Sequence, residues 1–135
     1  MRLIAVAVLL SGCQRGTARS AGSTGSDGTA VSTAAPVVAG VTPRSITMRA
    51  GEPVTLEITG TSFDAARNTV TLGPVSLNSI ASRANGTAIS FTVPDRVPSG
   101  GGAAPALWIS GSYALTVTTA RGTSAPVTIT VVETR

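Results

Sequence analysis

The clearest feature of the chain is a series of short segments in which large apolar residues alternate with polar ones. Val54, Leu56 and Ile58 alternate with threonine and glutamate, and the same period of two recurs further along the chain. A period of two sends successive side chains to opposite faces of a β-strand, so one face of each segment is expected to be buried. The pattern predicts strands at residues 54–59, 70–72, 89–93, 113–118 and 127–131.

Weaker strand signals lie between these segments. Residues 37–41 and 45–48 are interpreted as a first strand broken at Thr42-Pro43, and residues 75–82 as one or two edge strands. Asn85-Gly86 is a dipeptide typical of a hairpin turn. About seven strands in about 100 residues, with no helical segment, predict an all-β fold, a sandwich of two sheets rather than a barrel with a large lumen.

The N-terminal segment has the layout of a secretory signal. One arginine precedes an unbroken apolar run from Leu3 to Leu10, which is followed by two small residues and then by Cys13. Eight helical residues cover about 12 Å, whereas the hydrocarbon core of a bilayer is about 30 Å thick. The run is therefore too short to span a membrane and is interpreted as part of a signal peptide, residues 1–12.

The next segment has the composition of a linker. Of the 22 residues from Gln14 to Ala35, 17 are Gly, Ser, Thr or Ala, and Val31 is the only larger aliphatic residue. Such a stretch cannot bury a core and predicts a disordered, flexible linker. We therefore expect Cys13 and the linker to occupy residues 13–35, and one folded domain to occupy residues 36–135.

The tetrapeptide Leu10-Ser11-Gly12-Cys13 resembles the lipobox of bacterial lipoproteins at all four positions. The resemblance implies that Cys13 becomes the mature N-terminus and carries fatty acids such as palmitate on its sulfur and amine. Two or three such chains would hold the protein on a membrane, since each buried methylene contributes about 0.8 kcal/mol. Gln14, where inner-membrane lipoproteins carry aspartate, implies the outer membrane if the cell is Gram-negative. The alternative is a lone reduced cysteine beside an ordinary signal peptide.

Composition and charge exclude several classes of function. All ten basic residues are arginines scattered singly along the chain, and aromatic residues make up only 3%. Nucleic-acid binding proteins gather basic and aromatic residues on one surface, so no nucleic-acid partner is expected. Histidine and lysine are absent, which leaves a serine or threonine nucleophile without its usual base, and the carboxylates show no calcium-loop spacing. We expect a protein that is not an enzyme and binds no metal or cofactor.

Several segments of the domain resemble a known family. Val41-Thr42-Pro43 is followed by Gly51-Glu52-Pro53-Val54-Thr55-Leu56, by Gly60-Thr61-Ser62-Phe63 and later by Gly111-Ser112-Tyr113-Ala114-Leu115. In order and spacing, residues 36–135 resemble the IPT/TIG domains, which are found in plexins, some transcription factors and many bacterial surface proteins. The resemblance implies an immunoglobulin-like two-sheet sandwich that serves protein interaction or presentation.

Three residues of these motifs have an expected structural role. Gly60 is expected to let the chain bend away from its strand while Phe63 folds back to close one end of the core. Tyr113 occupies the place of a tyrosine corner, in which the ring packs inside and the hydroxyl bonds to a backbone group upstream.

The candidate contact residues lie in an insertion, Pro94 to Ser110, that is predicted to be a loop. Leu107, Trp108 and Ile109 form a large apolar cluster next to three consecutive glycines, and such a patch is typical of a protein-binding or sugar-stacking site. The alternative is that Trp108 covers the core of the sandwich or belongs to an extension of a strand. We expect a lipid-anchored cell-envelope protein that contacts the membrane through Cys13 and binds an envelope protein; the alternative is a carbohydrate-binding surface lipoprotein with a glycan partner.

Overall fold

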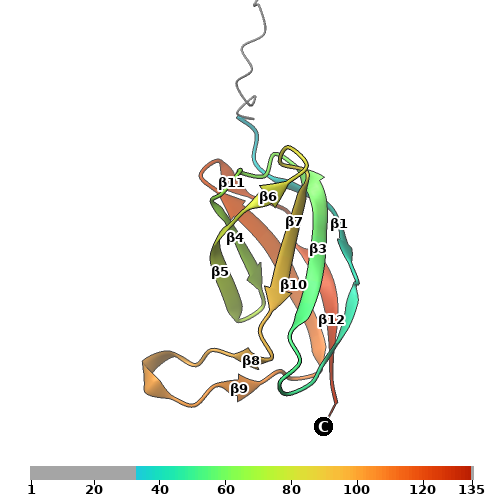
Figure 1. The fold of residues 1–135 in the computed structure, drawn as a ribbon, viewed down its shortest axis with the longest axis vertical. Helices are drawn as coiled ribbons and strands as arrows, with labels where there is room; N and C mark the ends of the chain where they lie inside the picture. Colours follow the sequence, from blue (N-terminus) through green and yellow to red (C-terminus); the bar gives the residue numbers. More distant parts are fainter. Residues whose placement is uncertain (1–32, 135) are drawn as a thin grey trace, which may run out of the picture.

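The computed structural model describes residues 33–134; the predicted signal peptide, Cys13 and nearly all of the predicted linker lie outside these residues. The described chain consists of strands and loops with one 3-10 turn, η1 (Gly100–Gly102), and has no α-helix. Two sheets face each other and enclose a single core (Figure 1). The predicted all-β, immunoglobulin-like sandwich is confirmed.

The two sheets differ in size, and a small third sheet projects at one end (Figure 1). The first sheet has the strand order β1 (Val37–Thr42), β3 (Val54–Thr61), β7 (Ala88–Val93) and β6 (Ser82–Arg83). The second has the order β2 (Ser45–Met48), β12 (Val127–Glu133), β10 (Gly111–Thr119), β4 (Asn68–Leu72) and β5 (Val75–Ile80), with β11 (Gly122–Thr123) paired to β10. The projecting sheet consists of β8 (Arg96–Val97) and β9 (Ala106–Leu107).

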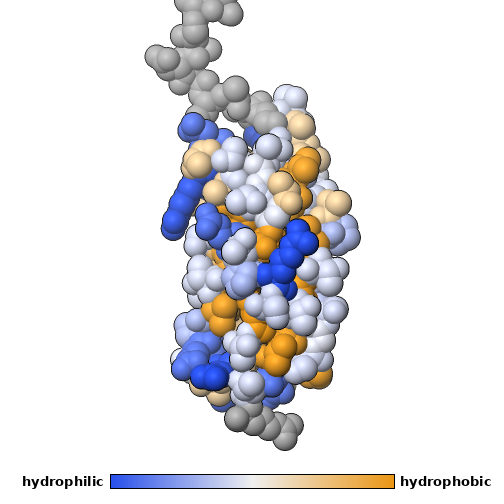
Figure 2. All heavy atoms as spheres, turned by 90° about the vertical axis from the view of Figure 1, so that its right-hand side faces the viewer, coloured by the Kyte–Doolittle hydropathy of each residue, from blue (hydrophilic) through white to orange (hydrophobic). Residues whose placement is uncertain are grey.

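The predicted break in the first strand is the point at which the chain changes sheets. β1 pairs with β3 in one sheet, and β2 pairs in parallel with β12 in the other. The Thr42–Pro43 peptide bond between them is cis. Pro43 has no N–H group to donate. Because it lies between the two strands, neither sheet loses a ladder hydrogen bond. Figure 2 shows the side of the sandwich next to β1, where hydrophobic side chains lie along the middle of the surface between less hydrophobic ones.

The core forms from the inward positions of both sheets, as the alternation predicts. Leu56 and Ile58 of β3 are fully buried, whereas Glu57 between them is exposed. Leu115 and Val117 of β10 are buried in the same way and face the first sheet. Alternate burial along each strand is what one buried and one solvated sheet face produce.

The structural roles predicted for Phe63 and Tyr113 are confirmed, whereas Gly60 lies within β3 and allows other groups to approach its backbone closely instead of bending the chain away. Phe63 is buried at the end of the core, and a β-carbon on Gly60 would collide with its ring and with the carbonyl oxygen of Val37. Tyr113 donates its hydroxyl hydrogen to the carbonyl of Ile109, four residues upstream, at 2.8 Å. Both ends of the sandwich are therefore closed by residues that the sequence motifs single out.

The predicted turn at Asn85-Gly86 connects β6 to β7. Asn85 and Gly86 have φ angles of 56° and 81°, in the left-handed region that asparagine and glycine tolerate. The N–H groups of Gly86 and Thr87 both donate to the carbonyl of Arg83 at 3.2 Å. The turn also contacts the preceding loop, because the carbonyl of Gly86 accepts the N–H of Phe63 at 3.1 Å.

Candidate functional site

The insertion predicted to be a loop is a short β-hairpin. Arg96 pairs with Leu107 and Val97 with Ala106, so β8 and β9 form an antiparallel ladder. The three consecutive glycines lie at its tip, where Gly101 and Gly102 have φ angles of 74° and 81°. Because these left-handed angles suit glycine, the glycine run serves a tight turn. The predicted loop therefore contains two short paired strands.

Trp108 belongs to the core. Its side chain is only 1% exposed, and its indole N–H donates to the carbonyl of Pro94 at 2.8 Å. The ring meets Tyr113 edge-to-face, with centroids 5.3 Å apart and an interplanar angle of 89°. Of the two alternatives for this residue, the structure supports the lid over the core, and its predicted place in an exposed contact patch is wrong.

The neighbours of Trp108 remain at the surface. Leu107 is 45% exposed and Ile109 is 74% exposed. Trp108 follows directly after β9, and the hydrogen bond of its indole to Pro94 holds its ring inward between these two exposed neighbours. The predicted contact patch is therefore reduced to Leu107 and Ile109.

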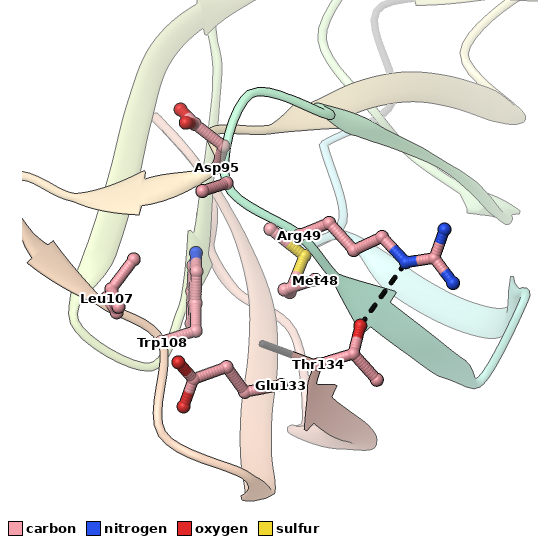
Figure 3. A pocket seen from close by; sticks show the side chains of 8 residues that line it. Met48, Arg49, Asp95, Leu107, Trp108, Glu133 and Thr134 are labelled. Carbon is pink, nitrogen blue, oxygen red and sulfur yellow. Dashed lines mark hydrogen bonds between the residues drawn. The ribbon is translucent and has the colours of Figure 1, made fainter.

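A cavity of about 560 Å³ opens beside Trp108, at the base of the hairpin (Figure 3). Three separate parts of the chain supply its wall: the end of β2 with the residues that follow it, the hairpin, and the end of β12. The lining residues are Met48, Arg49, Ala50, Asp95, Leu107, Trp108, Glu133 and Thr134. Cavities that hold small ligands or anchor side chains have volumes of this order.

Two of the three charged groups at the cavity have partners within the domain. Asp95 accepts the N–H of Gly51 at 2.9 Å, and its carboxylate lies 3.8 Å from the Nε atom of Arg96. Arg49 donates its Nε hydrogen to the Thr134 hydroxyl at 3.3 Å and lies 3.9 Å from the carboxylate of Glu52. These contacts hold the β2–β3 turn, the hairpin and the C-terminal strand together.

Glu133 is the third charged group. Its backbone N–H donates to the hydroxyl of Ser110 at 2.8 Å, which fixes the strand end against the chain leaving the hairpin. Its side chain extends toward the part of the cavity formed by Leu107 and Trp108 (Figure 3). Within residues 33–134 the carboxylate takes part in none of the three ion pairs, which are Arg49–Glu52, Arg96–Asp95 and Arg121–Asp64.

A second polar cluster, at the opposite end of the sandwich, is structural. Asn68 is fully buried: its Oδ1 atom accepts the N–H of Asp64, and its Nδ2 atom donates to the carbonyls of Asp64 and Ile80. The pKa of Asp64 lies below its ordinary value, chiefly because its carboxylate accepts the N–H of Ala66, with a further contribution from the N–H of Arg67; partial burial acts in the opposite direction.

No pattern in the sequence led us to expect a role for Glu133, Arg49 or Asn68. Arg49 and Thr134 are 85 positions apart, so no local motif places them at one cavity. Asn68 had a usable signal, because it occupies the inward register of β4, ahead of the buried Val70 and Leu72. A polar residue in an inward position predicts a hydrogen-bonded core group.

The described residues form an all-β sandwich with a cavity at the end that carries β8 and β9. Compared with protein-family models and with curated proteins, the chain matches none of them. Among residues 33–134 no group of three or more acidic or cysteine side chains is placed to hold a metal ion. The same residues contain no helix long and apolar enough to cross a membrane.

Proposed function

We propose that the chain is a non-catalytic bacterial lipoprotein of the cell envelope, attached to the membrane through lipid on Cys13. Its sandwich is an IPT/TIG-like domain that binds another envelope protein through the end that carries β8 and β9. Gln14 after the lipidated cysteine favours the outer membrane in a Gram-negative cell. The lipobox and the family motifs support the anchor and the domain type, and the geometry of the domain supports the mode of binding.

The observation that carries the proposal is the placement of the exposed aliphatic residues relative to the start of the domain. The described chain enters the sandwich beside β11, whereas the β8–β9 hairpin projects at the opposite end (Figure 1). A linker of 22 residues spans roughly 25 Å as a coil and up to about 70 Å when stretched. Leu107, Ile109 and the cavity would therefore face away from the membrane.

The burial of the aromatic residues favours a protein partner over a glycan. Phe63, Phe91 and Trp108 are all at most 5% exposed, and the ring of Tyr113 packs against Trp108. Together these four are the aromatic residues of the whole chain. Sugar binding by stacking needs an exposed aromatic face, whereas exposed aliphatic residues beside a cavity suit a protein surface.

The anchor is tested on Cys13. Mass spectrometry of the mature protein from bacterial membranes should find Cys13 as the first residue, carrying acyl chains on sulfur and on the amine. The Cys13→Ser variant should move to the soluble fraction, because the lipid supplies the membrane attachment. An intact Met1, or a free thiol on Cys13, contradicts the proposed anchor.

The binding surface is tested by photo-crosslinking in intact cells. A benzophenone side chain at position 109 should yield one discrete adduct, because Ile109 is exposed at the base of the hairpin, next to the cavity. The matched site is Thr128, exposed on the outer face of β12, where the same probe should yield no adduct. Leu107→Asp should abolish the adduct without changing the melting temperature. Equal labelling from both sites, or an adduct that persists in Leu107→Asp, would contradict binding through this end.

A further inference from the structure

The side chain of Glu133 is the starting point, because it is a half-buried carboxylate directed into an apolar part of the cavity. No side-chain oxygen of the described residues is both buried and unpaired, so the carboxylate of Glu133 stays open to solvent and to a ligand. Asp95 has an N–H donor and an arginine as partners within the domain, whereas no ion pair of the described residues includes Glu133. A cationic ligand in the cavity could therefore pair with this accessible carboxylate.

Arg49, the cation among the lining residues, is held away from this position. Its Nε atom bonds to Thr134, and one of its terminal nitrogens lies beside Glu52 on the outer side of the turn. Figure 3 shows its guanidinium pointing away from Trp108 and Glu133. The domain itself therefore does not neutralise the carboxylate through this arginine.

The walls around Glu133 suit an alkyl chain. Met48 and Trp108 are both buried, and Trp108 is fixed by its hydrogen bond to Pro94 and its contact with Tyr113. Leu107 lies at the opening and is partly exposed. An apolar wall that ends at a carboxylate is complementary to a side chain with an aliphatic stem and a cationic head.

We infer that the cavity receives an arginine side chain of the partner protein, with its guanidinium on the Glu133 carboxylate and its stem against Met48 and Leu107. Arginine is the better fit of the two long basic residues, since a planar guanidinium can bind a carboxylate through two parallel hydrogen bonds. The inference rests on the proposed protein-binding function. It adds the chemical group that the partner must present next to Leu107 and Ile109.

The inference is tested with small probes on the full chain carrying Cys13→Ser. Nα-acetyl-arginine amide is compared with Nα-acetyl-citrulline amide, which has nearly the same shape but no charge. The chain has one tryptophan, so the single indole N–H resonance in NMR spectra reports on Trp108. The arginine probe should bind about tenfold more tightly than the citrulline probe, the factor expected for one charge-assisted hydrogen-bonded pair.

Substitution of Glu133 provides the decisive comparison. Glu133→Gln should reduce the preference for arginine to about twofold or less, since a neutral amide replaces the carboxylate. Glu57→Gln, which removes an exposed carboxylate from the outer face of β3, should leave the preference unchanged. Equal affinity for the two probes, or a preference that survives Glu133→Gln, overturns the inference. A lysine probe that binds as tightly as the arginine probe overturns the choice of arginine.

The same variant in cells separates this inference from the proposed function. If the guanidinium belongs to a protein partner, Glu133→Gln should weaken the crosslink from position 109 while Glu57→Gln does not. Suppose that the arginine probe binds selectively but that Glu133→Gln leaves the yield of the adduct unchanged. The cavity is then a site for a small cationic molecule, and the assignment to a partner side chain is overturned. Absence of any adduct from position 109 contradicts the proposed function, whatever the probes show.

Discussion

Replacing Trp108 by alanine should lower the free energy of unfolding by about 3 to 5 kcal/mol. The side chain is 1% exposed, and its removal would leave a large void between the hairpin base and β10. The carbonyl of Pro94 would lose its indole donor, and Tyr113 would lose the ring that it meets edge-to-face. Urea denaturation followed by circular dichroism measures the change, with the slope of the transition checked for two-state behaviour.

Ile109→Ala is the matched control for this prediction, because Ile109 is the next residue and is 74% exposed. Its effect should stay within about 0.5 kcal/mol, as is usual for surface substitutions. If Trp108→Ala does not fold, Trp108→Phe tests the same point, since it retains an aromatic ring and should cost about 1 to 2 kcal/mol.

In the unsubstituted protein, Trp108 emission should be blue-shifted and resist quenching by iodide. A red emission maximum with a stable Trp108→Ala variant would show that the residue is at the surface.

The sandwich could be predicted because residues close together in the sequence determine each of its main strands and turns. The alternation in residues 54–59 determines which face of β3 is buried, whatever the strand pairs with. Thr42-Pro43 marks the crossing between sheets, since proline interrupts a ladder at the position where it stands. Asn85-Gly86 marks its turn for an equally local reason, namely the left-handed angles that these two residues tolerate.

The hairpin and the cavity could not be predicted because they depend on contacts between residues that lie far apart in the sequence. β8 and β9 each contain two residues, which is too short for a period of two to be visible in the sequence. Whether Trp108 faces in or out depends on the register of that small ladder and on the acceptor that Pro94 offers. The position of Glu133 at the cavity depends on the parallel pairing of β12 with β2. These two strands lie far apart in the sequence, near the C-terminal and N-terminal limits of the domain.

Replacing Asn68 by leucine should lower the free energy of unfolding by about 3 kcal/mol, although leucine has a similar size and is apolar. Asn68 is fully buried and makes three hydrogen bonds to backbone groups, at 2.8 Å to the N–H of Asp64 and at 2.6 and 2.7 Å to the carbonyls of Asp64 and Ile80. Leucine would leave all three groups unpaired in the interior, at about 1 kcal/mol or more each. Urea denaturation measures the loss.

Asn78→Ala is the control on the neighbouring strand, because Asn78 is exposed and accepts one hydrogen bond, from the hydroxyl of Thr69. Its effect should stay within about 0.5 kcal/mol. Amide hydrogen exchange separates loss of the hydrogen bonds from a general packing defect. In Asn68→Leu, the amide hydrogen of Asp64 should exchange faster than in the unsubstituted protein. The increase should be smaller at Val117, which lies within β10. Asn68 joins the loop after β3 to β5, so its removal should free that loop before the sheets separate. A variant as stable as the unsubstituted protein, or uniform acceleration at both amides, would show that the hydrophobic core alone positions this loop.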